Sequence, residues 1–349
     1  MRRFLAVLWS VLFFTLSGSF AVSASPVERF VMFKGAGDAM LAGLLTLPED
    51  EDEAPFPAML LLQGSGPTDR DGNQLPEIRT NLLRQIARDL AEEGIASLRF
   101  DKRGLHANAK DLPQGPAELR TFMAWENFVA DAEMGYRWLA SDLEIDGERV
   151  GVAGHSEGGL IALEISQRRK VSPRALVLLA TPGRPFGAVL RDQLNGLLDR
   201  QGATARQRTF FLAEDQRIRA AILATGEVPD DVPAGLQALY PSYLGLYFQP
   251  LLQLDPAKAL EGYAGPALLL AGGRDQQVSP ERDFQPLAAV LQSKDDGSAA
   301  FIAPEVSHNL KPVKAGEAGF EGRIDAGIKA ELTGWLTRML IDEDTASRH

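Results

Sequence analysis

The sequence predicts an α/β fold, in which a mostly parallel β-sheet is covered by helices on both faces. Short, continuously apolar segments, typical of buried parallel strands, alternate along the chain with segments of helical periodicity. Two apolar runs near the start enclose a glycine-containing turn, which predicts an N-terminal antiparallel hairpin. Residues at about 186–262 carry helical periodicity without a strand signal, which predicts a helical cap inserted between two strands.

The individual elements follow from these patterns in chain order. The hairpin joins residues 30–33 to residues 41–47. Buried strands are expected at the short, mostly apolar runs at 57–62, 95–100, 150–153, 175–180, 266–271 and 301–304. Amphipathic helices are expected where apolar residues recur at helical spacing, at 79–93, 122–139, 160–165 and 324–340. The carboxyl ends of the parallel strands should therefore share one edge of the sheet.

Composition and charge limit the classes of function. The chain has 349 residues and 45% hydrophobic content, enough for one large domain or two modest ones. Its net charge of -11 argues against a nucleic-acid partner, because nothing would offset phosphate repulsion. There is no Cys, hence no disulfide, and a metal site would need carboxylates and the four His residues. We therefore expect no metal.

The first 24 residues predict a secretory signal peptide. Met1-Arg2-Arg3 is followed by an apolar core at 4–16 and then by small residues up to Ala24. Cleavage is expected after Ala24, leaving 25–349 as one secreted or periplasmic domain that contains the cap. The core is shorter than the roughly 20 residues that span a bilayer, so no stable membrane span is expected after cleavage. An uncleaved anchor is the alternative.

The stretch Gly154-His155-Ser156-Glu157-Gly158 predicts a nucleophile elbow between a buried strand and a helix. In such a turn Ser156 would adopt a strained backbone conformation that lifts its hydroxyl clear of the sheet. The glycines would leave room for the close approach of strand and helix. The backbone NH of Glu157 would lie at the helix start, where amides are free to bind an oxyanion. An ordinary turn that carries a Ser is the alternative.

A glycine-rich loop, Gln63-Gly64-Ser65-Gly66-Pro67, follows the strand at 57–62. A loop in this position can supply a second oxyanion donor, and the NH of Ser65 is the candidate, with Gly66 as its neighbour. A phosphate-binding loop is the competing interpretation. The stretch lacks both the Gly-Lys-Ser/Thr and the Gly-x-Gly-x-x-Gly pattern, which argues against phosphate.

A serine hydroxyl needs a general base to become a nucleophile. His308 follows the last expected strand, which places it at the same sheet edge as Ser156. His155 adjoins the nucleophile and should point away from it, His106 is a possible base, and His349 is the last residue. We therefore predict His308 as the base, with a surface histidine as the alternative.

An acid is needed to orient the base and to stabilise its imidazolium form. Asp275 follows the expected strand at 266–271 and is the candidate, with Asp255 and Asp283 as alternatives. An ion pair with Arg274 is the competing role for Asp275. The candidates occur along the chain in the order nucleophile, acid, base.

Aromatic residues of the expected cap could line an acyl pocket, although packing of the cap on itself would also explain them. With the loop residues beside the elbow, the pocket candidates are Gly66, His106, Tyr243 and Tyr247.

Several stretches together resemble the α/β-hydrolase superfamily and, within it, a group of bacterial secreted or cytoplasmic carboxylesterases. They are 41–48, 64–73, Arg99-Phe100-Asp101-Lys102-Arg103-Gly104, Gly154-His155-Ser156-Glu157-Gly158-Gly159, 273–278 and Ser307-His308-Asn309. The resemblance implies a Ser156, Asp275 and His308 triad, oxyanion donors near Ser65 and Glu157, and no cofactor. Such relatives often carry Gly-x-Ser after the Arg-Gly pair. Here Leu105-His106-Ala107-Asn108 stands instead, so the pocket lip should differ.

The function expected from these features is hydrolysis of a small-molecule acyl ester through an acyl-enzyme. An acyl thioesterase or a serine aminopeptidase could use the same triad, and the acidic loop Asp69-Arg70-Asp71 could capture an amino terminus. A non-catalytic binding module is the remaining alternative, and the presence of all three triad residues argues against it. The sequence sets neither the acyl length nor the oligomeric state.

Overall fold

The computed structural model describes residues 26–50, 53–168 and 170–342. Within this part of the chain, eight strands form a single sheet in the order β1-β2-β4-β3-β5-β6-β7-β8. Strand β2 runs antiparallel to β1 and β4, and the other neighbouring strands are parallel. The strands are β1 (Val27–Lys34), β2 (Met40–Leu47), β3 (Phe56–Leu62), β4 (Ala96–Phe100), β5 (Ile145–His155), β6 (Leu176–Leu179), β7 (Ala267–Gly272) and β8 (Ala299–Ala303).

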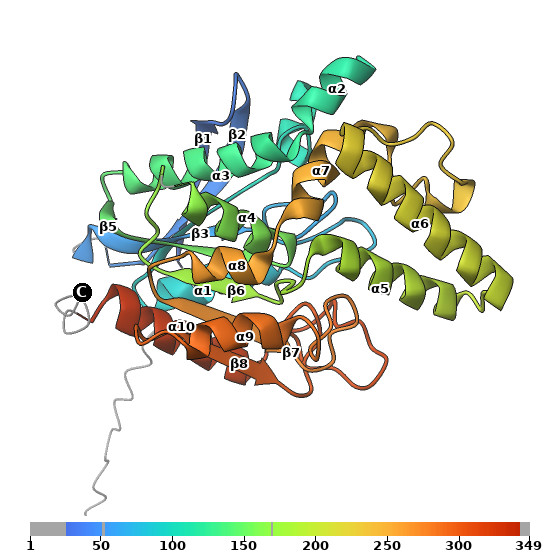
Figure 1. Cartoon of the computed structure of the whole chain (residues 1–349). Coiled ribbons are helices and arrows are strands. Elements are labelled where there is room, and N and C mark those ends of the chain that lie inside the picture. The colour runs from blue at the N-terminus through green and yellow to red at the C-terminus, as the bar shows by residue number, and fades with distance from the viewer. Residues whose placement is uncertain (1–25, 51–52, 169, 343–349) are drawn as a thin grey trace, which may run out of the picture.

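Helices cover both faces of this sheet (Figure 1). Helices α1 and α10 pack together on one face, and α3, α4, α8 and α9 form a row on the other. The helices are α1 (Leu82–Glu92), α2 (Pro116–Phe122), α3 (Trp125–Ala140), α4 (Glu157–Gln167), α5 (Phe186–Arg200), α6 (Ala205–Thr225), α7 (Gly245–Gln253), α8 (Pro256–Glu261), α9 (Phe284–Gln292) and α10 (Ala326–Leu340). The mostly parallel α/β architecture with its N-terminal hairpin is confirmed.

Alternating side chains of the central strand β3 explain why helices are needed on both faces. Leu60 and Leu62 face the core beneath α3 and α4, whereas Met59 and Leu61 face the core beneath α1 and α10. All seven residues of β3 are buried. Burial of both faces of a strand requires an uninterrupted apolar run, which is why this strand was visible in the sequence.

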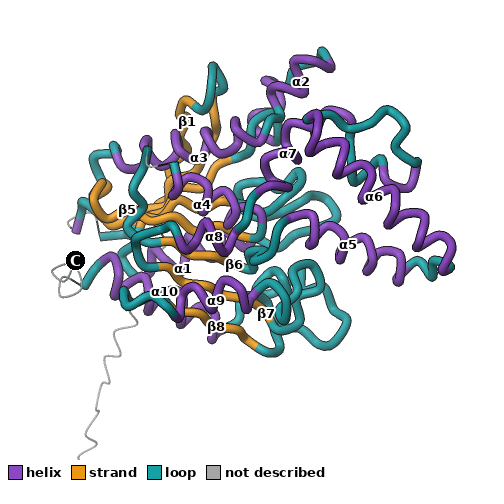
Figure 2. Tube along the Cα trace, viewed as in Figure 1, coloured by secondary structure: helices purple, strands orange, loops and turns teal. Residues whose placement is uncertain are grey.

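Between β6 and β7 the regular structure is helical and consists of α5, α6, α7, α8 and two short 3₁₀ turns. Helices α5, α6 and α7 lie beyond one end of the sheet, and loops gather at that end (Figure 2). We call α5–α7 (residues 186–253) the insertion. Helix α8 instead packs against α4 and α9, so it belongs with the helices that cover the sheet.

The helices expected at 79–93 and 122–139 begin later in the structure than their periodicity predicts. Asn81 has a left-handed backbone with φ 48°, so α1 starts at Leu82 rather than at residue 79. Ala124 is extended and separates the short α2 from α3, where one helix from residue 122 was expected. The expected signal peptide and its cleavage site after Ala24 lie outside the described residues. Among the residues described, no helix has both the length and the apolarity required to cross a bilayer.

Candidate active site

The turn between β5 and α4 holds Ser156 in a strained conformation. Ser156 has φ 53° and ψ -116°, and its backbone NH donates to Leu179 O at 2.8 Å. The turn is tight because a Cβ on Gly154 would lie 2.1 Å from Gly158 O, and one on Gly158 would lie 2.3 Å from Leu62 O. Only glycine fits at both places. A positive φ at a non-glycine residue is costly and persists where the surroundings enforce it.

The chain brings Asp275 and His308 into direct contact from the ends of β7 and β8. His308 Nδ1 lies 2.6 Å from Asp275 Oδ2, and both side chains are buried. The other carboxylate oxygen, Asp275 Oδ1, accepts the backbone NH of Gln277 at 2.7 Å and of Val278 at 2.9 Å. The carboxylate is thus fixed in orientation and can hold His308 with its proton on Nδ1, leaving Nε2 free to accept a proton.

His155 supports His308 from behind the candidate nucleophile. Its Nε2 lies 2.9 Å from His308 O, and the two rings have centroids 4.7 Å apart. A carbonyl oxygen can only accept, so Nε2 of His155 carries the proton. Burial lowers the pKa of His155 to about 3, and the neighbouring His308 adds to this effect. His155 therefore stays neutral and fixes the backbone of His308.

Both expected oxyanion donors lie beside Ser156. Glu157 is the first residue of α4, so its NH has no acceptor within the helix. Ser65 lies in the loop after β3, and Ser65, Ser156 and Glu157 line the same cavity. The loop rests directly on the elbow, because a Cβ on Gly64 would lie 3.2 Å from His155 Nδ1 and 3.5 Å from Ser156 Cβ.

A buried network around Lys102 was missed by sequence reasoning. Lys102 Nζ donates to Gly64 O at 2.7 Å and Gly66 O at 3.2 Å, and lies 3.0 Å from Glu157 Oε1. The hydroxyl of Tyr247 donates to Glu157 Oε2. Burial, and then the charge of Glu157, raise the pKa of Tyr247 well above its ordinary value, so it stays protonated. Lys102 lies in residues 99–104, one of the stretches that carry the family resemblance. Its partners are distant in sequence, so no local pattern indicated the network.

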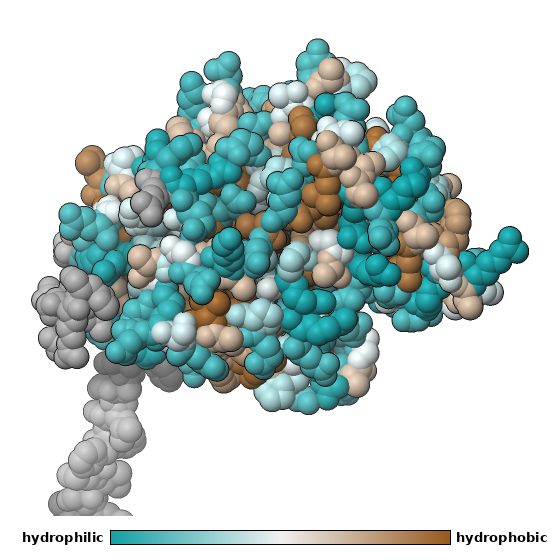
Figure 3. Space-filling model, viewed as in Figure 1, coloured by the Kyte–Doolittle hydropathy of each residue, from teal (hydrophilic) through white to brown (hydrophobic). Residues whose placement is uncertain are grey.

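The cavity in front of Ser156 has a volume of about 440 Å³ and is lined mainly by apolar and aromatic side chains. Three of the four pocket candidates line it, namely Gly66, Tyr243 and Tyr247. His106 does not. Its ring is directed to the loop, with Nε2 2.8 Å from Pro67 O, at the start of a 3₁₀ helix (His106–Asp111). Hydrophobic residues also gather on the outer surface over α7 (Figure 3).

Comparisons with known proteins agree with this architecture. The sequence profile of the serine aminopeptidase (S33) family matches residues 79–213. The esterase EstD of Thermotoga maritima is 27% identical over 303 residues, which cover 85% of this chain and 66% of EstD. The Pyrococcus furiosus esterase Pf2001 superposes with a TM-score of 0.57 at 15% identity, covering 90% of this chain and 92% of that one. The chain has the α/β-hydrolase fold.

A second solved structure supports the same fold. Protein PA2218 of Pseudomonas aeruginosa superposes on this chain with a TM-score of 0.55 at 18% identity, covering 96% of this chain and all of that one. Among the residues described, no group of three His, Cys, Asp or Glu side chains could hold a metal ion.

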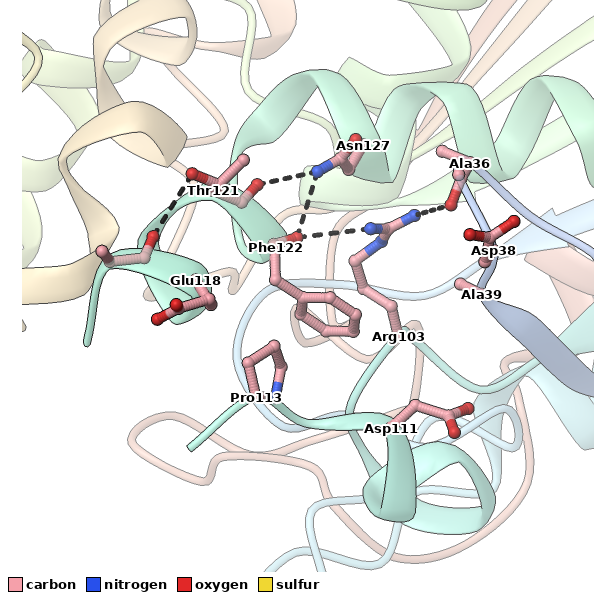
Figure 4. Close-up of a pocket in the computed structure, with 12 residues that line it drawn as sticks. Ala36, Asp38, Ala39, Arg103, Asp111, Pro113, Glu118, Thr121, Phe122 and Asn127 are labelled. Atoms are coloured by element: carbon pink, nitrogen blue, oxygen red, sulfur yellow. Dashed lines mark hydrogen bonds between the residues drawn. The ribbon is translucent and has the colours of Figure 1, made fainter. Parts of the chain in front are cut away.

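A larger hollow of about 710 Å³ lies on the outer side of the protein, between the β1–β2 turn and α2 (Figure 4). Arg103 reaches into it but is already neutralised, since its Nε and Nη2 donate to the two carboxylate oxygens of Asp131, each at 2.7 Å. The guanidinium also lies 4.9 Å from the centre of the Phe122 ring. Neither Ser156 nor His308 lines this hollow, so it is separate from the candidate active site.

Proposed function

We propose that this α/β-hydrolase cleaves carboxylic esters by acyl transfer through Ser156, with His308 as general base and Asp275 as its partner. The observation that carries the proposal is the buried Asp275–His308 pair, at 2.6 Å, in which His308 also contacts His155, the residue before Ser156 in the strained turn. A serine nucleophile, a base and an orienting acid are the three side-chain parts of this kind of serine hydrolysis.

The mechanism follows from the position of each group. Ser156 Oγ attacks the ester carbonyl carbon while His308 Nε2 takes the hydroxyl proton, and Asp275 stabilises the resulting imidazolium. The backbone NH groups of Ser65 and Glu157 hold the oxyanion, and each donor of this kind contributes about 3 to 4 kcal/mol to lowering the barrier. His308 then protonates the departing alcohol. Water, deprotonated by His308, then attacks the acyl carbon, and His308 returns the proton to Ser156 Oγ as the bond to Ser156 breaks and the acid leaves.

The cavity favours an uncharged acyl group. Its lining contains two charged residues, Lys102 and Glu157, and these neutralise each other. A charged substrate group would therefore be desolvated without a counter-charge, whereas an alkyl or aryl group would gain from contact with the apolar walls.

A serine aminopeptidase is the second candidate, because that family profile matches residues 79–213. An aminopeptidase needs a free carboxylate to bind the substrate's amino terminus. The carboxylate in this cavity belongs to Glu157, and both of its oxygens are engaged, by Lys102 and by Tyr247. We therefore expect p-nitrophenyl esters to be cleaved far faster than aminoacyl p-nitroanilides, and the opposite order would favour the peptidase.

Substitution of Ser156 by Ala tests the proposal most directly. Without the nucleophile, kcat should fall by about a million-fold, as in other serine hydrolases of this kind. A fluorophosphonate probe should add one adduct, mapped to Ser156, in the parent and none in Ser156→Ala. A chain-length series of p-nitrophenyl esters would then report the depth of the cavity. Ester turnover by Ser156→Ala within tenfold of the parent would refute the assignment.

We also propose export of this α/β-hydrolase, on the pattern of residues 1–24 alone. Expression of the full chain in a bacterium should give a periplasmic or secreted protein whose first residue is Ser25. An intact N-terminus beginning at Met1 would contradict export by cleavage.

A further inference from the structure

Lys102 contacts the glycine-rich loop after β3 on both sides of Ser65. Its ammonium donates to Gly64 O at 2.7 Å and to Gly66 O at 3.2 Å. The carbonyl of Gly64 and the NH of Ser65 belong to one planar trans peptide, in which C=O and N–H point in opposite directions. An ammonium that fixes the direction of Gly64 O therefore also fixes the direction of the Ser65 NH.

The same ammonium also holds the residue that supplies the second donor. Lys102 Nζ lies 3.0 Å from Glu157 Oε1, and both side chains are buried. The Glu157 NH adjoins Ser156 at the start of α4. One cation thus joins two segments that are separated along the chain, the loop after β3 and the turn after β5.

The insertion closes this network. Tyr247, in α7, donates its hydroxyl to the second carboxylate oxygen of Glu157. Its ring packs edge-on against Trp125 and Phe128 of α3, with centroids 5.4 Å apart in each case. The position of Glu157 is therefore coupled to the seating of α7 on α3.

We propose that Lys102 is a positioning residue, which sets the two oxyanion donors at the spacing that the transition state requires, and that Tyr247 makes this spacing depend on the seated insertion. This inference rests on the proposed function. Lys102 need not touch the substrate: it acts through Gly64 and Glu157. Such an arrangement contributes to catalysis because donors must be aimed at the oxyanion before the charge develops.

A purely structural lysine elsewhere in the chain provides a matched control. Lys294 Nζ donates to Tyr263 O at 2.8 Å and Gly265 O at 2.6 Å, and lies 3.3 Å from Asp296. It thus binds two carbonyls, two residues apart, and a carboxylate, as Lys102 does. It does not line the cavity in front of Ser156. Lys294→Met and Lys102→Met therefore remove the same kind of contact in different places.

The experiment measures kcat and KM for a p-nitrophenyl ester, and Ki for an alkyl trifluoromethyl ketone. Ser156 Oγ adds to the ketone carbonyl and His308 takes the proton. The product is a hemiketal oxyanion that lies between the NH groups of Ser65 and Glu157. Lys102→Met should lower kcat by about 100-fold, the effect of a small misplacement in an active site, and leave KM unchanged. Ki should rise by the factor by which kcat/KM falls. Lys294→Met should match the parent in kcat, KM and Ki.

The other outcomes test the positioning role of Lys102 and the proposed function separately. If Lys102→Met matches Lys294→Met in kcat and Ki while Ser156→Ala is inactive, the positioning role is overturned and the proposed function stands. If Ser156→Ala keeps its activity, the proposed function itself fails. Should Lys102→Met not fold, Tyr247→Phe, which removes only a hydroxyl, takes its place: a lower kcat with a parallel rise in Ki supports the network, and parental values overturn it.

Discussion

Two buried carboxylates of this protein hold nitrogen groups in nearly the same way, yet they serve different ends. Asp275 accepts from His308 at 2.6 Å, and Asp131 accepts from Arg103 at 2.7 Å. All four side chains are buried. The partner makes the difference, because an arginine stays charged at any accessible pH, whereas a histidine can gain and lose a proton near neutrality.

The surroundings of the two pairs differ as well. Asp131 lies on α3 and also accepts the NH of Ala36 at 2.7 Å, so the pair fastens the β1–β2 turn to a helix. Asp275 accepts two NH groups of its own loop, and that loop reaches the cavity through Gln277 and Val278. Similar geometry thus gives a fixed cross-link in one place and, on the proposed function, a held base in the other. The distance between the two groups and their burial do not by themselves distinguish a structural ion pair from an acid–base pair.

Replacement of Asp275 by Asn should have the largest effect on kcat of the substitutions in the two pairs. The amide can donate to His308 Nδ1 and so favour the wrong tautomer, and on the proposed function kcat should fall by about ten-thousand-fold, as in a known Ser-His-Asp triad. The urea concentration at the midpoint of unfolding should change little, whereas kcat falls by this large factor. Steady-state kinetics at pH 7 and urea titration of the same preparation would measure both. A variant that keeps a tenth of the parental kcat would remove Asp275 from the mechanism.

Replacement of Asp131 by Asn should have the opposite profile. It leaves the buried Arg103 without a counter-charge, and loss of one partner of a buried ion pair typically costs about 3 to 5 kcal/mol of unfolding free energy. The kcat per folded molecule should match the parent, since Arg103 does not line the cavity in front of Ser156. Urea unfolding and active-site titration would separate the two effects. A large loss of kcat with unchanged stability would contradict the comparison.

Acid should reveal an effect on stability that depends on His155. The pKa of His155 is about 3 in the folded protein against an ordinary 6.5, so between these values the unfolded chain binds a proton that the folded one does not. Its contribution to stability is complete above pH 6.5 and is lost as the pH falls toward 3, by about 1.4 kcal/mol per pH unit. His155→Gln should lack this part of the pH dependence. Parallel pH profiles of parent and variant, by urea unfolding, would refute the assignment.

The sequence revealed the features that leave a local or periodic signature. Strands such as β3 are uninterrupted apolar runs because both faces are buried. Ser156, Asp275 and His308 could be placed at one sheet edge because each follows an expected strand. The roles assigned to these residues stay predictions until the substitutions above are made.

Other features depend on contacts that no local pattern records. Lys102 meets Gly64 and Glu157 across 38 and 55 positions of sequence, so its role emerges only when the strands are assembled. His106 was expected at the pocket, but its left-handed backbone, with φ 51°, directs the ring to Pro67 instead. Helix α9 went unnoticed because it is short, with nine residues.

The hydrogen bond from Tyr247 to Glu157 has a consequence for the timing of turnover. The insertion is seated on the end of the sheet where Ser156 lies, and one of its own side chains contributes to the network beneath the proposed oxyanion donors. If the insertion lifts to admit an ester or release an acid, this bond must break. On the proposed function, an open molecule is therefore one whose oxyanion site has lost a support, and the greatest access and the greatest reactivity would belong to different conformations. Such a device would confine chemistry to the interval in which the substrate is enclosed and bulk water is excluded.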